Sequence, residues 1–241
     1  MKSILLIICL FLISSSCQKQ ETDSLIDDRD GHKYATIKIG NQWWMAENLA
    51  YLPFVSEVKD SSGIWVYGYN GKSVDYAKTL ESFLEYGCLY SWTYAMDIPE
   101  KYNSELWGSS DSLHQGICPD GWHLPSDTEW QQLEDYLDTD PEFTPSDNRQ
   151  NTGNVGKKIK ATTTWTDADE NNESGFGALA TGFRYETGFF LNKGKYTYFW
   201  SSTEYYTKSA LYRYLWDDSQ GTFRGYPLKI NGLSVRCVKD Y

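Results

Sequence analysis

The sequence contains few of the residues that build metal centres and catalytic bases. Only three histidines and five cysteines occur in 241 residues, and no two cysteines are spaced as Cys-x-x-Cys. The histidines, His32, His114 and His123, stand far from any pair of cysteines along the chain. Because a zinc site needs closely spaced histidine and cysteine ligands, the sequence predicts no zinc site.

Motifs for calcium and for phosphate are missing as well. Asp28, Asp30 and Gly31 have the spacing that begins a calcium loop, but no glutamate stands at the closing position. A tight turn explains the same residues through the turn preferences of aspartate and glycine. The glycines of segment 153–157 lack the spacing of a phosphate-binding loop, and no serine or threonine follows Lys157. We therefore expect neither a metal ion nor a cofactor.

Positive charge is also scarce. The chain has 22 lysines and arginines against 33 aspartates and glutamates, which gives a formal net charge of −11. The strongest basic cluster is Lys157-Lys158 with Lys160, and longer basic runs are absent. Nucleic acids and anionic lipid headgroups would be repelled by such a surface. The sequence therefore predicts no nucleic-acid partner.

The longest apolar run, from Ile4 to Ile13, is too short to span a membrane. It follows the single positive charge of Lys2 and precedes three serines and Cys17, a pattern typical of a secretory signal. A cysteine directly after small residues is the acceptor that lipoprotein processing requires. We therefore expect Cys17 to be lipidated and to hold the protein in the outer-membrane lipid of the cell envelope, on the periplasmic or the outer side. An ordinary signal peptide, with Cys17 as a bystander, is the alternative.

Residues 18–30 are polar and mostly acidic, so they are expected to be a solvated, mobile tether. The whole chain has only seven prolines and three methionines but 19 glycines, and 16% of it is aromatic. Such a composition favours a β-rich, loop-rich domain with a core of tryptophan and tyrosine. The predicted organisation is a signal peptide over 1–16, an acidic tether over 17–29 and one domain over 30–241.

The cysteine count limits the possible disulfides. Cys9 leaves with the signal peptide and Cys17 takes the lipid, so three cysteines remain in the domain: Cys88, Cys118 and Cys237. An odd number in an oxidising compartment permits one disulfide and one spare thiol. All three pairings are open. The pair Cys118–Cys237 would close the longest loop and stabilise the fold by about 4–5 kcal/mol, less any strain.

Local patterns predict a hairpin, two helices and several strands. Residues 34–39 alternate as a strand, Gly40-Asn41 form a turn, and residues 42–45 return. Residues 53–75 show no regular period. Residues 76–96 are expected to be a helical region that Gly87 interrupts, with Leu89, Trp92 and Met96 on one buried face. A second helix begins at Ser126, which forms a capping box with Glu129. Its buried residues are expected to be Trp130, Leu133 and Leu137, and its solvent-facing residues Gln131, Gln132, Glu134 and Asp135.

The last third of the domain is expected to form an antiparallel sheet. Residues 138–175 are polar and poor in large apolar groups, which favours a long loop. Short β-branched and aromatic segments separated by glycine and asparagine turns follow. The candidate strands are 178–184, 198–202, 210–215, 222–226 and 233–238.

Three stretches in this order resemble the Fibrobacter succinogenes major paralogous domain, which is common in lipoproteins of the Bacteroidetes and Fibrobacteres. The resemblance covers about residues 28–241. The stretches that carry it are Asp30-Gly31 with Ile39 to Leu49, then Leu89 to Trp92 with Ala95-Met96 and Ile117 to Trp130, and finally Phe199 to Glu204 with Gly232 to Asp240.

That family is similar to the C-type lectin fold and, more distantly, to the sulfatase-modifying enzymes that generate formylglycine. The resemblance implies an α+β, C-type-lectin-like fold with two helices, short antiparallel sheets and long loops. It also implies a disulfide between Cys118, just before the second helix, and Cys237 in the last strand. Cys88 would then be a free, buried thiol.

The resemblance does not carry an activity with it. The sulfatase-modifying enzymes use a reactive cysteine pair late in the chain, whereas only Cys237 is late here. The calcium-dependent sugar motifs of C-type lectins are absent, and Trp216-Asp217-Asp218 lacks the required amide. His123 is expected to make a structural hydrogen bond, and His114, although close to Asp111 and Ser112, does not make a triad by adjacency. We expect no catalytic residues, with an enzyme of the wider fold group as the alternative.

Many aromatic residues lie outside the family motifs, between residues 185 and 226. If they share one surface, they could stack on sugar rings or anchor a protein partner; otherwise they cover a thin sheet. The expected function is recognition of a glycan or a protein through aromatic-lined loops between about 140 and 226. A structural or adhesive part in a surface assembly, recognisable by an exposed edge strand, is a further alternative. The residues are Tyr185, Phe189, Phe190, Tyr196, Tyr198, Tyr205, Tyr206, Tyr212, Tyr214, Trp216 and Tyr226.

Overall fold

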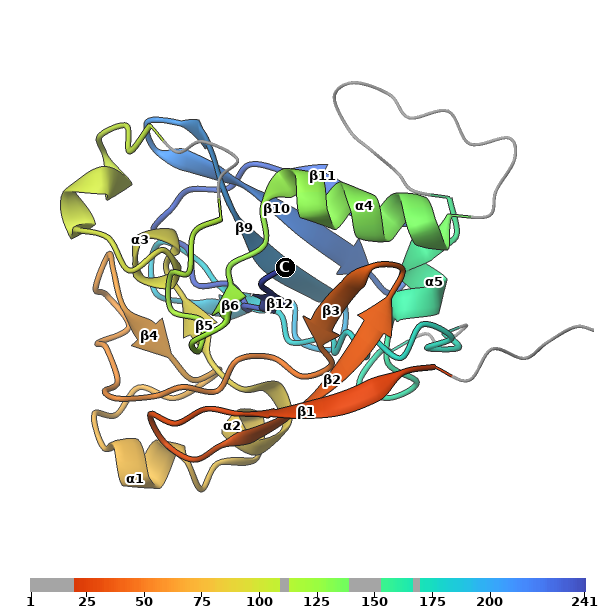
Figure 1. The fold of residues 1–241 in the computed structure, drawn as a ribbon. Helices are drawn as coiled ribbons and strands as arrows, with labels where there is room; N and C mark the ends of the chain where they lie inside the picture. Colours follow the sequence, from red (N-terminus) through yellow and green to blue (C-terminus); the bar gives the residue numbers. More distant parts are fainter. Residues whose placement is uncertain (1–19, 109–112, 139–152, 167–169) are drawn as a thin grey trace, which may run out of the picture.

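The computed structural model describes residues 20–108, 113–138, 153–166 and 170–241. Within these ranges no helix is long and apolar enough to cross a membrane. Cys17, the predicted lipidation site, lies outside the described residues. The described chain has a mixed α/β architecture of small antiparallel sheets and few helices (Figure 1).

The largest sheet joins the beginning of the domain to its end. Its order is β1-β2-β3-β12-β6, and every neighbouring pair is antiparallel. The hairpin predicted from the alternation of residues 34–45 is confirmed, with Gly40 at a φ of 60° in its turn. The five strands are β1 (Thr22–Ile26), β2 (Lys33–Ile39), β3 (Gln42–Met45), β6 (Trp122–His123) and β12 (Val238–Lys239).

Strand β1 corrects the predicted acidic tether over 17–29. Residues 22–26 pair with β2 from Thr22 opposite Ile37 to Ile26 opposite Lys33. The acidic composition suggested a solvated segment because most of these side chains are indeed exposed. Their backbone groups, however, bond to the free edge of β2, a tertiary partner that local composition does not reveal. The predicted turn at residues 28–31 is confirmed, since the Gly31 amide donates to the Asp27 carbonyl at 2.7 Å.

A second sheet of three antiparallel strands has the order β11-β10-β9. It consists of β9 (Tyr196–Tyr206), β10 (Ser209–Trp216) and β11 (Phe223–Gly225). Helix α4 (Asp127–Leu137) packs against β9 and β10, as Figure 1 shows. Two strand pairs, β4 (Ile64–Trp65) with β5 (Leu89–Tyr90) and β7 (Phe183–Arg184) with β8 (Phe190–Leu191), complete the sheets.

The predicted strands of the last third are partly correct. Those at 198–202 and 210–215 are confirmed and extend further, and 222–226 becomes β11. Only the end of 178–184 forms a strand, and 233–238 contributes one residue to β12. The physical reason is that these two segments cross the interior and form isolated bridges, such as Phe199 with Ser234, in place of a continuous ladder.

The helical region predicted over 76–96 is partly correct: Gly87 interrupts it as expected, but Leu89 and Tyr90 form a strand. The segment divides into α1 (Val74–Ala77), α2 (Glu81–Tyr86), β5 and α3 (Trp92–Ala95). Gly87 ends α2 with a φ of 68°, and a Cβ there would lie 2.8 Å from the Leu49 carbonyl oxygen. Leu89 and Trp92 are buried as expected, but they belong to a strand and to a separate helix turn. The short 3-10 helix η1 (Glu100–Asn103) follows.

Helix α4 begins at the predicted capping box. The Ser126 hydroxyl accepts from the Glu129 amide at 3.2 Å, and the Glu129 carboxylate accepts from the Ser126 amide at 2.9 Å. Trp130 and Leu133 are buried as predicted. Glu134, expected to face water, is buried because its carboxylate pairs with Arg213 of β10 at 2.8 Å. Helix α5 (Val155–Ile159) lies in the region expected to be a loop.

Buried cations hold the irregular segments together. Arg184 donates to the carbonyls of Val58, Asp60 and Ile230, and the Lys229 ammonium donates to those of Tyr102, Glu105 and Thr207. Buried carbonyl groups outside regular strands need donors, and these long side chains reach several at once. Side chains of the same kind include Lys160, Arg184, Arg213, Lys229 and Arg236.

Candidate functional site

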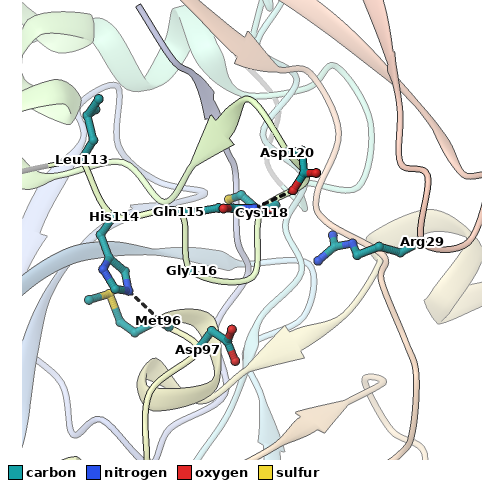
Figure 2. Close-up of a pocket in the computed structure, with 9 residues that line it drawn as sticks. All are labelled: Arg29, Met96, Asp97, Leu113, His114, Gln115, Gly116, Cys118 and Asp120. Atoms are coloured by element: carbon teal, nitrogen blue, oxygen red, sulfur yellow. Dashed lines mark hydrogen bonds between the residues drawn. The ribbon is translucent and has the colours of Figure 1, made fainter.

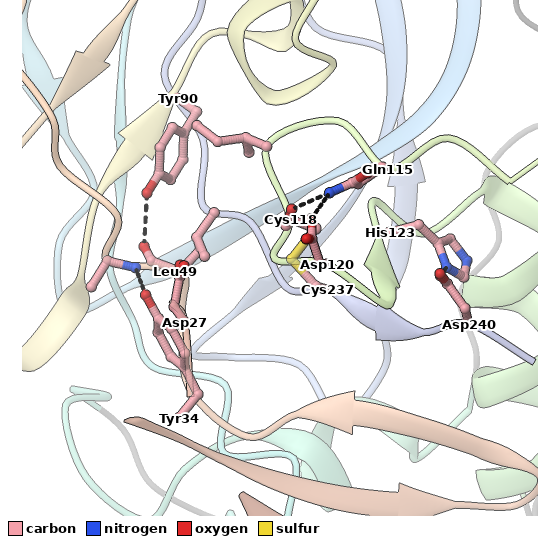
Figure 3. The surroundings of a disulfide bond; sticks show 12 residues. Asp27, Tyr34, Leu49, Tyr90, Gln115, Cys118, Asp120, His123, Cys237 and Asp240 are labelled. Carbon is pink, nitrogen blue, oxygen red and sulfur yellow. Dashed lines mark hydrogen bonds and ion pairs between the residues drawn. A yellow bond between two sulfur atoms is a disulfide. The ribbon is translucent and has the colours of Figure 1, made fainter. Parts of the chain in front are cut away.

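The predicted disulfide is present. Cys118 bonds to Cys237, which ties the segment before α4 to the last part of the chain across 119 residues (Figure 3). Cys88 is a free and fully buried cysteine, as expected. Burial raises the pKa of its thiol well above the ordinary range. The cysteines of the domain therefore include no accessible reactive pair of the kind that a sulfatase-modifying enzyme uses.

His123 and Glu129 are buried, and they contact ionisable groups of the two exposed C-terminal residues. Its Nδ1 lies 2.7 Å from an Asp240 carboxylate oxygen, and its Nε2 lies 2.8 Å from a Glu129 carboxylate oxygen. The Tyr241 hydroxyl donates to the same Glu129 oxygen at 2.8 Å. Since both ring nitrogens are engaged, neither is directed at a substrate. The predicted structural role of His123 is confirmed.

His114 borders an open pocket of about 430 Å³ beside the disulfide (Figure 2). Its Nε2 is 2.6 Å from the Met96 carbonyl oxygen, and Arg29 in the same wall is paired with Asp27 at 2.6 Å. Asp111 and Ser112, which the sequence places near His114, lie outside the described residues. The hydrogen bond of His114 and the ion pair of Arg29 therefore hold the loops around the pocket in place. The lining residues are Arg29, Met96, Asp97, Leu113, His114, Gln115, Gly116, Cys118 and Asp120.

Many of the aromatic residues outside the family motifs lie together on the three-stranded sheet. Six rings share the face of the three-stranded sheet opposite α4, and we call them the aromatic ladder. All six are half-buried. The ladder consists of Tyr196 and Tyr198 of β9, Tyr212, Tyr214 and Trp216 of β10, and Phe223 of β11.

The ladder follows from strict alternation along the strands. Side chains of a strand point to opposite faces in turn. In β10, Arg213 and Leu215 are buried on the face that α4 covers, so Tyr212, Tyr214 and Trp216 must point to the other face. In β9, buried Phe199 contacts Trp130 of α4, with ring centroids 5.6 Å apart. The flanking tyrosines of β9 therefore join the opposite face.

Strand register brings the rings of the ladder into contact. Tyr214 stands opposite Tyr198 in β9 and opposite Phe223 in β11. The corresponding centroid distances are 6.0 and 5.2 Å, and Trp216 lies 4.4 Å from Phe223. Cross-strand aromatic pairs of this kind stabilise a sheet by roughly 0.2–1 kcal/mol each. The ladder is therefore both a structural cover and a preformed, rigid surface.

Charged side chains of the same strands face away from the ladder. Arg213 and Arg224 are register partners on the α4 side, and both pair with Asp127. Arg213 also pairs with buried Glu134 at 2.8 Å. The carboxylate of Asp127, in the first turn of α4, therefore binds two guanidinium groups. The outward positions of β10 between Tyr212 and Trp216 carry no charge.

Further rings extend the ladder at one side. Phe183 of β7 lies 4.8 Å from Tyr198 between centroids and 6.2 Å from Tyr185. A separate exposed group, formed by Tyr205, Tyr206 and Tyr226, lies near the turn between β9 and β10, with Tyr205 stacked 4.4 Å from Tyr226. An exposed aromatic cluster thus exists in the expected part of the chain.

The sequence predicts recognition through aromatic-lined loops between about 140 and 226. The rings of the ladder stand on strands, and the residues between 139 and 152 lie outside the described structure. The alternation in Tyr-Thr-Tyr-Phe and in Tyr-Arg-Tyr-Leu-Trp was the available signal. What the sequence could not supply was the register, which decides whether the rings of two strands share one face.

Metal ligands do not converge in the described ranges, where no group of three or more histidine, cysteine, aspartate or glutamate side chains could hold an ion. The comparisons with known proteins gave one match. Residues 37–239 match the Fibrobacter succinogenes major domain. Neither a curated protein nor a solved structure matches the chain significantly. Because the match spans most of the sequence, the chain belongs to the Fibrobacter succinogenes major domain family.

Proposed function

We propose that this protein is a lipid-anchored, non-enzymatic recognition protein of the cell envelope that binds a glycan through the aromatic ladder. The observation that carries the proposal is the ladder itself, a continuous set of half-buried tyrosine, tryptophan and phenylalanine rings on one face of the sheet. Clusters of aromatic side chains that remain partly exposed are typical of binding surfaces.

The chemistry of the ladder suits a sugar better than another protein. Tyrosine combines a flat apolar ring with a hydroxyl group that donates and accepts hydrogen bonds. A sugar ring likewise has an apolar face of C–H groups and a rim of hydroxyls. Protein interfaces, in contrast, combine aromatic residues with arginine as their main contributors, and the arginines of this sheet are directed at Asp127 on the other face.

Rigidity supports the same interpretation. The rings stand on paired strands whose other face is fixed by the buried network of Arg213, Glu134 and Asp127. A ligand that meets a preformed surface does not have to order it, and this reduces the entropic cost of binding.

A glycan-array screen tests the proposal. The purified mature protein in detergent is applied with and without a calcium chelator, and Tyr214→Ala is compared with Tyr76→Ala, which removes an exposed tyrosine on α1 far along the chain from the ladder. Binding is expected to be independent of calcium and to weaken at least about tenfold in Tyr214→Ala. Tyr76→Ala should bind normally. Absence of glycan binding, together with capture of a specific protein that depends on Tyr214, would favour a protein ligand.

The lipid anchor is the second part of the proposal. It is supported by the order of Lys2, the apolar run Ile4 to Ile13, the three serines and Cys17. The Cys118–Cys237 disulfide also suits an oxidising compartment outside the cytoplasm.

Metabolic labelling with a palmitate analogue tests the anchor. Wild-type protein and Cys88→Ser should incorporate the label and sediment with outer membranes, whereas Cys17→Ser should do neither. Labelling that survives Cys17→Ser would contradict the anchor.

We also infer that the fold is related to that of C-type lectins and of the sulfatase-modifying enzymes. Support comes from the position of the disulfide, which joins Cys118, ahead of α4, to Cys237, beside the last strand. An experimental structure that superimposes on neither fold group would refute this relationship.

A further inference from the structure

We infer that the ligand of the aromatic ladder is an uncharged, linear polysaccharide, bound along the middle of its chain and not at its end. This inference rests on the proposed glycan-binding function and specifies the class of glycan. Two properties of the ladder carry it: its lack of charge, and its extension as a row of rings over several strands.

The ladder offers no cation to an acidic sugar. The two arginines of β10 and β11, Arg213 and Arg224, are held on the opposite face by Asp127. At the end of the ladder Lys195 is exposed next to Tyr196. The six positions of the ladder themselves carry no charged side chain. Recognition of sulfate or carboxylate groups requires cations placed to pair with them.

The net charge of the whole protein also disfavours an anionic ligand. The formal net charge is −11, and several cations are consumed in the interior, where Lys160, Arg184, Lys229 and Arg236 bind carbonyl groups. The surface that an approaching chain meets is therefore strongly acidic. An anionic polysaccharide would be repelled from it, whereas a neutral one would not.

The hydroxyl groups of the ladder are neutral partners as well. Burial raises the pKa of Tyr198 and Tyr212 above the ordinary tyrosine value, so both hydroxyls stay protonated. The Tyr198 hydroxyl accepts from the Asn192 side-chain amide at 3.1 Å, which leaves its own proton available for donation. Neutral hydroxyl and amide groups are the natural partners of sugar hydroxyls.

The extent of the ladder distinguishes a chain binder from an end binder. Ring contacts run without interruption from Tyr185 through Phe183, Tyr198 and Tyr214 to Phe223. These residues lie on four different strands or their flanks, and Phe183 and Tyr198 also pack against the buried core, so the row is exposed only in part. Successive sugar units of one chain can contact successive rings. Linked contacts of this kind raise affinity through effective concentration.

Titration calorimetry on the full mature protein in detergent tests the inference. The neutral probes are cello-, xylo- and manno-oligosaccharides of two to six units, and the anionic probe is oligogalacturonate of matched length. For at least one neutral series, affinity is expected to rise at least about tenfold from the dimer to the hexamer. That affinity should not change between low and high salt, because no ion pair contributes.

Three variants assign the result to the ladder. Tyr214→Phe keeps the ring and removes the hydroxyl, Tyr214→Ala removes both, and Tyr76→Ala is the matched control outside the ladder. The increase of affinity with length should persist in Tyr214→Phe and Tyr76→Ala and be lost in Tyr214→Ala. Circular dichroism and thermal unfolding identify any variant that fails to fold; if Tyr214→Ala does, Tyr214→Leu replaces it, because leucine removes the ring and keeps a large apolar side chain on the strand.

Each other outcome overturns a specific statement. Tighter binding of oligogalacturonate that weakens with salt would overturn the neutrality of the ligand and leave glycan binding intact. Equal affinity for dimer and hexamer would overturn binding along the chain and indicate recognition of an end. A glycan array without any binding would refute the proposed function itself, independently of charge and length.

Discussion

His123 shows how one residue fixes three segments at once. It belongs to β6, contacts Glu129 in the first turn of α4 and reaches Asp240 near the end of the chain. Burial lowers the pKa of His123, but the hydrogen bonds with Glu129 and Asp240 outweigh that effect and raise it above the ordinary value. Burial would raise the pKa of Glu129, yet His123 and the Ser126 amide lower it to about 2.

The pH dependence of stability follows from these two shifts. The folded pKa of His123 is above its unfolded value, so its contribution is complete below about pH 6.5 and is lost as the pH rises through the folded pKa. The folded pKa of Glu129 is below its unfolded value, so its contribution is complete above about pH 4.5 and is lost as the pH falls toward 2. Stability should therefore decrease on both sides of this window.

Denaturant unfolding of wild type and His123→Asn, followed from pH 5 to pH 9, checks the alkaline side. The difference in unfolding free energy between the two proteins should shrink as the pH rises, because the wild type alone loses the imidazolium contribution. His32→Asn is the control for removing a histidine outside this cluster. A difference that stays constant over the whole range would show that folding does not shift the pKa of His123.

At the scale of elements, hydrophobic alternation was a better guide than helical periodicity. The hairpin of residues 34–45 and the long strands β9 and β10 were predictable because each repeats with period two over several residues. In the helical region expected over 76–96, Trp92 and Met96 do lie on and at the end of α3, but Leu89 is buried in strand β5. The left-handed backbone at Gly87 interrupts the segment as expected.

Helix α5 offers a test of tertiary packing against intrinsic propensity. Gly156 lies inside this helix, where alanine would be favoured by roughly 1 kcal/mol on propensity. A Cβ at this position, however, would lie 2.2 Å from the Gly221 carbonyl oxygen and 2.8 Å from that of Gln220. Both are backbone atoms of the segment between β10 and β11, which cannot yield as a flexible side chain would.

We therefore expect Gly156→Ala to destabilise the protein by roughly 1–3 kcal/mol, as overpacking does. Denaturant unfolding measures the change, and Asp135→Ala on exposed α4 surface is the control, expected within about 0.5 kcal/mol of wild type. An unchanged or higher stability of Gly156→Ala would mean that α5 can move away from the 220–221 segment.

The whole molecule is held together by long-range links more than by regular elements. The Cys118–Cys237 disulfide spans 119 residues, and Arg236 beside it donates to the carbonyls of Met45, Phe176 and Gly177. Strand β12 then inserts between β3 and β6. The last residues of the chain therefore connect segments that have few strand-to-strand hydrogen bonds of their own.

Loss of the disulfide should cost about 4–5 kcal/mol, because the unfolded chain would regain the entropy of a loop of more than one hundred residues. The double variant Cys118→Ser/Cys237→Ser is compared with wild type in denaturant unfolding, each with and without reductant. Reductant should destabilise the wild type and leave the double variant unchanged. A response of the double variant to reductant would implicate Cys88, the remaining thiol of the domain.

The sequence by itself determined the features that depend on neighbouring residues. These include the hairpin at Gly40, the capping box of Ser126 and Glu129, the family membership and, through the family resemblance, the pairing of Cys118 with Cys237. Only the tertiary structure decided that β1 adds to the main sheet, that Glu134 is buried against Arg213 and that six aromatic rings share one face. All three have the same physical reason. Each depends on which strand edge or sheet face a segment packs against, and the register between segments far apart in the sequence decides this.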